Sequence, residues 1–223
     1  MRVSDYTGDK LDEKAASWLR EIRSQVAPRP RLSLAPARAA LLVIDMLEYF
    51  ANPSGRCFLS ASPAIVPRIR ALVSAFRAMG RPVIYTRHGH EGPGDLGMLG
   101  RFFGDYIKKG EPESAIIPAL RPRGGEPVIP KTTYDAFIGT DLGRVLDEAG
   151  AEQVVVTGVL THMCCETTAR SAFCRGYEVY LPVDCVASSC EALHVASLRT
   201  MADAVAVLMS SFEVLQRCKP DAT

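Results

Sequence analysis

The chain has 223 residues, 48% of them hydrophobic and 23% charged, which is the composition of a folded globular protein and excludes extensive disorder. Its 26 basic and 25 acidic residues leave a net charge of +1, so no general positive field is available to hold nucleic acid or an anionic membrane. No apolar run is long enough to cross a bilayer or resembles a secretory signal, and seven cysteines without regular spacing favour reduced thiols in a cytoplasmic protein.

Helical and strand-like patterns alternate along the chain. Residues 9–26 carry apolar side chains at helical spacing, and the prolines after them predict an extended arm. Residues 40–45 form a continuous apolar run that ends in Asp45, which is typical of a strand buried on both faces. Further strands are predicted at 82–86, 127–130, 153–157, 178–183 and 204–208, and further helices at 63–79, 141–149, 162–175 and 190–202, with a long glycine-rich loop over 87–110.

This alternation predicts a mostly parallel sheet with helices on both faces. Ligands of such sheets bind beyond the carboxyl ends of the strands, so the residues that follow each strand become the candidates for a site. These residues are Asp45, 86–88, Lys131, 158–165 and 184–185, and among them Asp45, Lys131 and Cys164 are the candidates for a shared reaction.

Cys164 lies where a strand is predicted to turn into a helix. At a helix N-terminus the free N–H groups and the positive end of the helix dipole lower the pKa of a thiol and stabilise an oxyanion, so Cys164 is a candidate nucleophile. The alternative is that this cysteine only packs in the core, as free cysteines frequently do. For the adjacent Cys165, packing is the preferred interpretation.

Asp45 and Lys131 suit the same reaction. A carboxylate at the end of an apolar strand is costly unless it is paired or used, and Asp45 would accept the thiol proton as a general base or else cap a neighbouring loop. Lys131 would hold that carboxylate ionised and polarise a substrate carbonyl, although most lysines are solvated surface groups. We interpret the three residues as one site, because chance rarely places three reactive groups at three strand ends.

Four segments of the chain also carry a family resemblance. They read LLVIDM at 41–46, VIYTRH at 83–88, PKTTYDAFIGTDL at 130–142 and TGVLTHMCCETTARSAF at 157–173. In this order the chain resembles the isochorismatase-like hydrolase superfamily, and in particular its cysteine-hydrolase branch of nicotinamidases, N-carbamoylsarcosine amidases, and ureidoacrylate and biuret hydrolases. The most specific of the segments aligns Cys164 with the family nucleophile.

The resemblance implies a three-layer α/β/α domain over residues 38–223, with a six-stranded parallel sheet of Rossmann-like topology, after an N-terminal helix and arm at 1–37. The family usually forms homo-oligomers, so a dimer or tetramer is expected. The stretch 89–118 and the N-terminal arm are the candidate contacts.

The resemblance also implies the catalytic groups. They are a triad of Cys164, Asp45 and Lys131, a cis peptide bond between Val159 and Leu160, and an oxyanion hole formed by the backbone N–H groups of Leu160 and Cys164. The implied reaction is hydrolysis of the C–N bond of a small amide or ureido substrate through a thioester intermediate.

The chain departs from the family at His162, where members commonly carry Asp. Isochorismatases also have His there, but they have Gly in place of the cysteine and hydrolyse a vinyl ether by acid catalysis from the Asp. Cys164 therefore favours thioester chemistry, and a vinyl-ether hydrolase that uses Asp45 alone is the alternative. A second alternative is a non-catalytic protein on the same scaffold that binds a small molecule or another protein.

No metal or other cofactor is expected. His88 and His90 lie in the loop after the second predicted strand, but the carboxylate of a zinc site is missing there and no third histidine follows nearby. The segment GPGDLG at 92–97 matches a dinucleotide-binding fingerprint in its letters, but it neither follows a strand directly nor opens a clean helix. The expected partner is a small-molecule substrate, not nucleic acid or a membrane.

Several side chains near the strand ends are predicted to line the substrate pocket. They are Tyr49, Arg87, His88, Tyr134, Phe137 and His162. Arg87 would pair with a substrate carboxylate or take part in a structural ion pair. Phe137 would wall the pocket or belong to the core.

Overall fold

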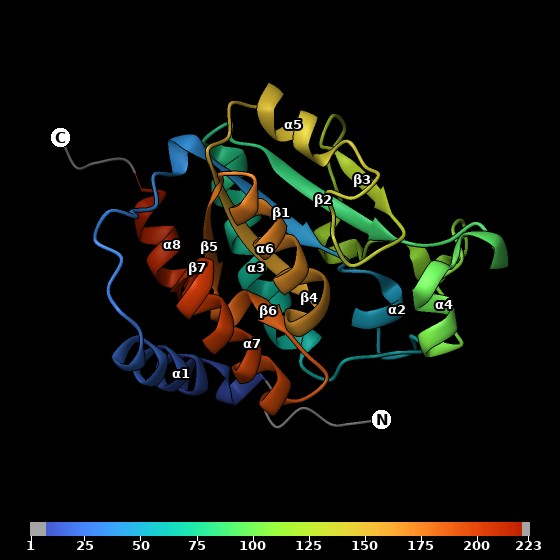
Figure 1. The fold of residues 1–223 in the computed structure, drawn as a ribbon, viewed down its shortest axis with the longest axis horizontal. Coiled ribbons are helices and arrows are strands. Elements are labelled where there is room, and N and C mark those ends of the chain that lie inside the picture. The colour runs from blue at the N-terminus through green and yellow to red at the C-terminus, as the bar shows by residue number, and fades with distance from the viewer. Residues whose placement is uncertain (1–7, 220–223) are drawn as a thin grey trace.

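A parallel β-sheet forms the centre of the computed structural model, which describes residues 8–219 (Figure 1). The strands follow the order β3-β2-β1-β4-β5-β7, and every neighbouring pair is parallel. They are β1 (Ala39–Ile44), β2 (Val83–His88), β3 (Val128–Lys131), β4 (Gln153–Val159), β5 (Glu178–Pro182) and β7 (Ala206–Met209). The six predicted strands are confirmed, and the short β6 (Val186–Ala187), which the sequence does not predict, pairs with the end of β4.

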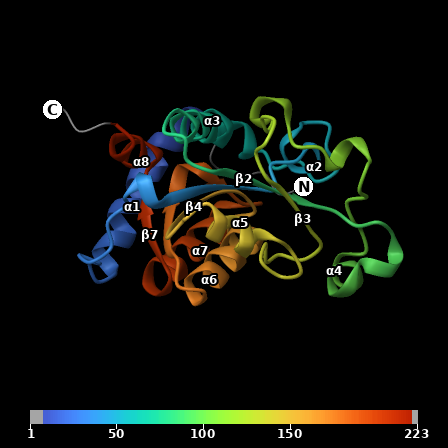
Figure 2. The same ribbon diagram turned by 90° about the horizontal axis from the view of Figure 1, so that it is seen from above.

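Helices cover both faces of the sheet, so the chain has the expected three-layer architecture. They are α1 (Leu11–Gln25), α2 (Glu48–Ala51), α3 (Ser62–Ala78), α4 (Gly97–Phe103), α5 (Leu142–Glu148), α6 (Glu166–Cys174), α7 (Glu191–Ala204) and α8 (Ser211–Arg217). Figure 2 shows α3 on one face of the sheet and α5, α6 and α7 on the other. At the β7 edge, Arg23 of α1 donates a hydrogen bond from Nη2 to the Leu208 carbonyl oxygen (2.9 Å).

β1 and β4 are the central strands, and every residue of both is buried. A sheet that is covered on both faces needs such continuous apolar strands, and for this reason they can be predicted from the sequence. Their register pairs Ile44 with Gly158, so the chain leaves both strands at the same edge of the sheet. His88 at the end of β2 pairs with Lys131 at the end of β3. The fold therefore brings Asp45, Lys131 and the turn after β4 to one edge.

The short helices α2, α4 and α8 are not predicted from the sequence. α4 lies in the stretch expected to be a loop, because seven residues with two glycines carry no readable helical period. The expectation that no helix follows the GPGDLG segment is therefore wrong, although that segment still starts at Gly92 and not directly after β2, which ends at His88. The start of α8 could have been predicted, since Ser210 and Glu213 form a reciprocal capping box at its N-terminus.

The N-terminal helix α1 contributes to the main hydrophobic core. Its buried face consists of Leu11, Ala15, Trp18, Leu19 and Ile22. By contrast, α4 projects from the body of the molecule (Figure 1), and its Met98 and Phe102 side chains are 65% and 78% exposed. The oligomer stays a prediction, for which α4 is the better candidate contact because the apolar face of α1 is already covered. No helix within residues 8–219 combines the length and hydrophobicity needed to cross a membrane.

Gly158 lies against the backbone of Ile44 near the end of β4 and β1. Its φ of 111° lies in the region that favours glycine, and a Cβ atom built at this position would lie 2.0 Å from the Ile44 carbonyl oxygen. Neither the backbone conformation nor the space at this position accepts a larger residue.

We expect Gly158→Ala to lower the free energy of unfolding by about 2–5 kcal/mol, because backbone strain and overpacking act together. Gly143→Ala is the matched control, since Gly143 lies in α5 and its added Cβ would meet no heavy atom within 4 Å. Alanine is favoured in helices, so the control should gain up to about 1 kcal/mol. Equilibrium unfolding in urea measures both changes, and equal stability of the two variants would contradict the interpretation.

Candidate active site

Asp45 follows β1 directly, and hydrogen bonds from β2 hold its carboxylate. Oδ1 accepts from the Thr86 hydroxyl (2.6 Å) and from the His88 backbone N–H (3.1 Å), while the Thr86 hydroxyl accepts from the Asp45 N–H (3.0 Å). The φ of Asp45 is 47°, a left-handed value that Asp tolerates better than most residues and that is typical of functional sites. Thr86 ends the predicted strand 82–86 and is a site residue to which the sequence assigns no role. Its spacing of two from His88 along a strand is the signal that places both on one face.

Lys131 ends β3 and connects the carboxylate to the thiol. Its Nζ lies 2.7 Å from Asp45 Oδ2 and donates hydrogen bonds to Cys164 Sγ (3.3 Å) and to the Thr133 carbonyl oxygen (2.9 Å). The Asp45 and Lys131 side chains are inaccessible to water, and Cys164 is 7% exposed. The three residues predicted to form the site therefore meet in one buried cluster.

Cys164 lies in a wide π-helical turn between β4 and α6. The Leu160 carbonyl oxygen accepts hydrogen bonds from two backbone N–H groups of this turn, at 3.1 and 3.2 Å, so the turn winds around that carbonyl. The peptide bond between Val159 and Leu160, which the resemblance implies to be cis, is cis. The adjacent Cys165 is completely buried, as its packing interpretation expects.

The Asp45 and Lys131 side chains form a charged pair at neutral pH. Burial alone raises the pKa of the Asp45 carboxyl, but the charge of Lys131, with smaller effects from His88 and Thr86, holds this pKa below its ordinary value. Burial alone lowers the pKa of the Lys131 ammonium, but the charges of Asp45 and Cys164 raise it above its ordinary value. Each member of the pair thus keeps the other ionised away from water.

The thiol differs from the sequence prediction. The position at a helix N-terminus predicts a lowered pKa, whereas burial raises the pKa of the Cys164 thiol to about 12, and the Lys131 ammonium offsets only part of this effect. The Asp45 carboxylate also raises it, because a second negative charge beside the first is unfavourable. The resting cluster therefore contains a neutral thiol, and a base must remove its proton during any nucleophilic attack.

His88 and His90 do not meet the requirements of a zinc site. Among residues 8–219, no group of three His, Cys, Asp or Glu side chains is arranged to hold a metal ion. His88 Nδ1 lies 3.5 Å from Lys131 Nζ, and burial together with the Lys131 charge lowers the pKa of His88 to about 4. The positive charge of Lys131 at this distance would repel a metal ion bound to His88 Nδ1. His90 is buried, and its Nδ1 lies 3.1 Å from the Asp95 carbonyl oxygen.

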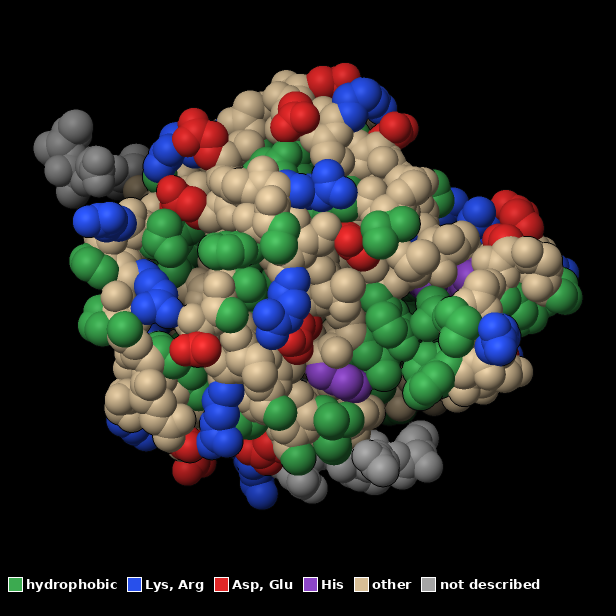
Figure 3. Space-filling view, in the orientation of Figure 1, with side chains coloured by type: hydrophobic (Ala, Val, Ile, Leu, Met, Phe, Trp, Pro, Cys, Tyr) green, Lys and Arg blue, Asp and Glu red, His purple; other side chains and the backbone are tan. Residues whose placement is uncertain are grey.

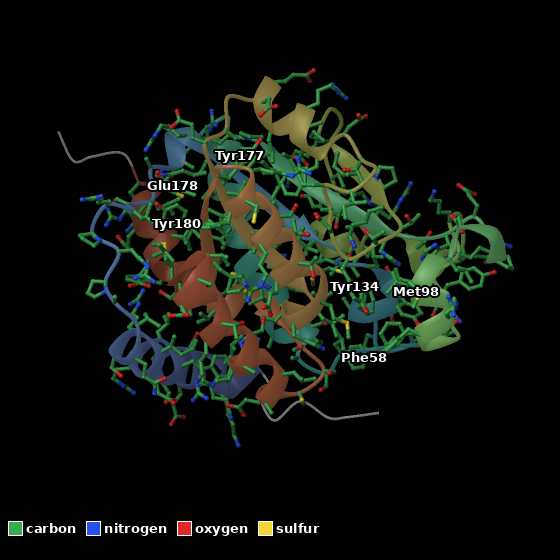
Figure 4. The ribbon with its side chains drawn as sticks, viewed as in Figure 1. Phe58, Met98, Tyr134, Tyr177, Glu178 and Tyr180 are labelled. Atoms are coloured by element: carbon green, nitrogen blue, oxygen red, sulfur yellow. The ribbon has the colours of Figure 1, made fainter. Side chains whose placement is uncertain are left out.

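Tyr134 is a predicted pocket residue that the thiol influences electrostatically. Burial raises the pKa of Tyr134, and the charge of Cys164 raises it further when the thiol is ionised. Figure 4 places Tyr134 on the same side of the molecule as Phe58 and Met98, which come from two other segments. Figure 3 shows hydrophobic side chains gathered on this side. This side of the molecule is therefore partly apolar.

His162 precedes the nucleophile candidate by two residues and is half-buried. Its Nδ1 contacts the Ser188 hydroxyl, a partner that the sequence analysis does not identify. Burial lowers the pKa of His162, although Glu166 opposes the effect, so the imidazole is neutral at pH 7. It offers hydrogen bonds to a ligand but no positive charge.

Arg87 does not join the cluster. It lies on β2 between Thr86 and His88, both of which contact the Asp45 and Lys131 pair. Side chains alternate between the two faces of a strand, so Arg87 projects from the opposite face, where it is exposed. The predicted bidentate contact of Arg87 with a substrate carboxylate has no support from this geometry.

Tyr49 and Phe137 make contacts away from the thiol. The Tyr49 hydroxyl donates a hydrogen bond to Asp105 Oδ2 (2.9 Å), and its ring belongs to a small separate hydrophobic cluster. Phe137 is part of the main core and stacks on Tyr177 with ring centroids 6.1 Å apart. These contacts favour the core interpretation of Phe137 and a structural role for Tyr49.

Several known proteins resemble this chain in sequence or in fold. Residues 39–213 match the isochorismatase domain family. The chain is 38% identical over 174 residues to Nicotinamidase 3 from Arabidopsis thaliana, which covers 77% of this chain and 84% of that protein. It is 34% identical over 155 residues to the isochorismatase of Bacillus subtilis (strain 168), covering 68% of this chain and 49% of that protein. A solved cysteine hydrolase from Pseudomonas syringae pv. phaseolicola 1448A has a TM-score of 0.82 at 30% identity and covers 86% of this chain and 97% of its own.

We expect Lys131→Met to lower the free energy of unfolding at pH 8 by about 3–5 kcal/mol, because it leaves a buried carboxylate without its cation. The unpaired Asp45 carboxyl then has a raised pKa, so the folded state binds more protons than the unfolded state and the variant loses stability as pH rises. The native chain follows the opposite trend and loses stability in acid, since its Asp45 pKa is lowered.

The double variant Asp45→Asn, Lys131→Met is the control, because it removes both charges together. Urea unfolding at pH 5 and pH 8 should show that it recovers most of the loss. If the double variant is as unstable as Lys131→Met at pH 8, the ion pair is not the reason for the instability.

Proposed function

This chain belongs to the isochorismatase family, and we propose that it is a cysteine hydrolase that cleaves the C–N bond of a small carboxamide or ureido substrate through a thioester. One observation carries the proposal: Lys131 Nζ lies 2.7 Å from the Asp45 carboxylate and 3.3 Å from the Cys164 sulfur. A nucleophile, a base and a cation are thereby in contact, which is the arrangement that covalent catalysis requires. Similarity to a nicotinamidase and to a cysteine hydrolase supports the same chemistry.

The first half of the reaction forms the thioester. Asp45 accepts the thiol proton while Cys164 Sγ attacks the carbonyl carbon of the substrate. The electron pair of the carbonyl moves to its oxygen, which receives hydrogen bonds from the backbone N–H groups of Leu160 and Cys164. The C–N bond then breaks, and Asp45 passes its proton to the departing nitrogen, which leaves as ammonia or an amine.

The second half hydrolyses the thioester. Asp45 takes a proton from a water molecule, whose oxygen attacks the same carbonyl carbon and regenerates the oxyanion. The C–S bond breaks, the sulfur of Cys164 recovers its proton from Asp45, and the acid product leaves. Lys131 stays protonated throughout and stabilises each negative charge as it appears on carboxylate or sulfur, which its raised pKa supports.

The surroundings of the sulfur favour a substrate without a negative charge. His88 and His162 both have lowered pKa values and are neutral at pH 7, and Arg87 lies on the opposite face of β2. Tyr134, whose pKa is raised by burial and then by the charge of an ionised Cys164, has a flat and partly apolar ring. We therefore propose a small and largely apolar carboxamide as the preferred substrate class.

We expect Cys164→Ala to lower kcat/KM by about 10³-fold or more without unfolding the protein, because it removes the sulfur that lies 3.3 Å from Lys131 Nζ and that would form the thioester. Ammonia release from a panel of carboxamides and ureido acids measures the activity, and mass spectrometry detects the acyl adduct on Cys164. Cys174→Ala is the matched control, since Cys174 is exposed.

Two results would replace the proposal. Full activity of Cys164→Ala on a vinyl ether, abolished by Asp45→Ala, would indicate an isochorismatase-type reaction. Binding without any turnover by the native chain would indicate a non-catalytic protein.

We also expect kcat/KM to be independent of pH between about 6 and 9. The reactive form combines an ionised Asp45, whose pKa lies below the ordinary 3.8, with a neutral thiol, whose pKa is about 12. Activity should therefore fall only in acid, where Asp45 becomes protonated. Initial rates in buffers of constant ionic strength test this. A rise in kcat/KM with a midpoint between pH 7 and 9 would show that a preformed thiolate is the reactive species.

A further inference from the structure

Helix α7 contacts the first residue of the turn that carries Cys164. Thr161, the first residue of the turn, is completely buried, and its Oγ1 lies 2.9 Å from Nδ1 of the equally buried His194 of α7. The hydroxyl of Ser197, one helical turn further along α7, lies 3.2 Å from the Thr161 carbonyl oxygen and 2.5 Å from Glu166 Oε2. The same helix therefore contacts both the side chain and the carbonyl of Thr161.

Helix α1 completes this arrangement from the other side of His194. The Trp18 ring lies against the His194 ring with centroids 4.7 Å apart, and Trp18 Nε1 donates a hydrogen bond to Glu191 Oε1 (3.0 Å) at the start of α7. Lys14 Nζ contacts the second oxygen of Glu191 (2.5 Å). The chain of contacts thus runs from α1 through His194 to Thr161. α1 lies outside residues 39–213, the range that matches the family.

The position of Thr161 matters for the chemistry. Thr161 lies between Leu160 and Cys164 in the chain. A shift of Thr161 therefore changes the distance between the backbone N–H groups of Leu160 and Cys164, which are proposed to bind the oxyanion. Donors of this kind act only when they are preorganised, and a displacement of about 1 Å costs about 10²-fold in rate. Substrate binding depends on the neighbouring side chains and is less sensitive to such a shift.

We propose that His194 and Trp18 are positioning residues, which hold Thr161 so that the backbone N–H groups of Leu160 and Cys164 converge on the oxyanion. This inference rests on the proposed thioester reaction. It assigns to the N-terminal helix a part in catalysis that its packing on the core alone does not require. His194 acts as a neutral group, because burial, with a smaller effect of His162, lowers its pKa to about 3.

The test compares His194→Ala with His194→Asn, because an asparagine amide can replace Nδ1 as the partner of the Thr161 hydroxyl. We expect His194→Ala to lower kcat at least tenfold with KM unchanged within twofold, and His194→Asn to restore kcat to within threefold of the native value. Trp18→Ala should lower kcat in the same way. Leu19→Ala is the matched control, since Leu19 is buried on the same helix and its loss should leave kcat unchanged.

A second readout needs no turnover. Hydrogen exchange followed by mass spectrometry should show backbone amides 160–165 exchanging at least tenfold faster in His194→Ala and Trp18→Ala than in the native chain or Leu19→Ala. If His194→Ala does not fold, Thr161→Val removes the same hydrogen bond at nearly constant volume, and the same changes are expected.

The outcomes separate this inference from the proposed function. Unchanged kcat and unchanged exchange at 160–165, in a native chain that releases ammonia, would overturn the positioning role and leave the reaction standing. A native chain that releases no ammonia from any amide would overturn the proposed function and, with it, the catalytic meaning of the contact. Equal losses of kcat in Leu19→Ala and Trp18→Ala would reduce the role of α1 to general stability and overturn the inference for Trp18.

Discussion

The buried ion pair between Asp45 and Lys131 is the constraint on which the rest of the structure depends. Two charges removed from water are costly unless each finds its partners, and here the two side chains are 2.7 Å apart and inaccessible to solvent. The partners come from three strands, since β1 leads to Asp45, β2 supplies Thr86, and β3 ends in Lys131. The sheet order β3-β2-β1 satisfies the pair, and a strand inserted between β2 and either neighbour would leave a buried charge without compensation.

Burial keeps the Cys164 thiol neutral, and the same ion pair provides a way for the proposed reaction to proceed from that neutral form. Burial is the main reason that the pKa of Cys164 is raised, and Asp45 adds to it, because a thiolate would place a second negative charge next to one ammonium. Transfer of the thiol proton to Asp45 removes the conflict, because it leaves one negative charge, now on sulfur, opposite Lys131. The net charge of the cluster is unchanged by that transfer. A buried site of this kind moves a proton between its own members and needs no charge from solvent.

Continuous apolar runs predict the strands of the sheet, and the residues that follow these strands predict the members of the site. β1 and β4 are readable because both faces of the sheet are covered, and Asp45, Lys131 and Cys164 because each follows a strand. The pKa direction of Cys164 is not readable, since the helix N-terminus is visible in the sequence but the depth of burial is not. The side on which Arg87 projects is not readable for a different reason. Its alternation with Thr86 is visible, but which face of β2 meets Asp45 depends on how the strands pair.

The role of α1 shows most clearly what a pattern of residues leaves open. The apolar face of this helix is predicted, and the structure confirms that it is buried, but amphipathicity states only that a helix packs and not which surface it covers. Here the covered surface includes His194, which contacts Thr161 at the start of the π-helical turn that carries Cys164. That turn is then fixed on one side by the charge of Lys131 and on the other by α7 and α1. The proposed oxyanion hole consists of backbone N–H groups and has no side chain to adjust, so its accuracy would come from the packing around the turn, including packing that lies outside the segment shared with the family.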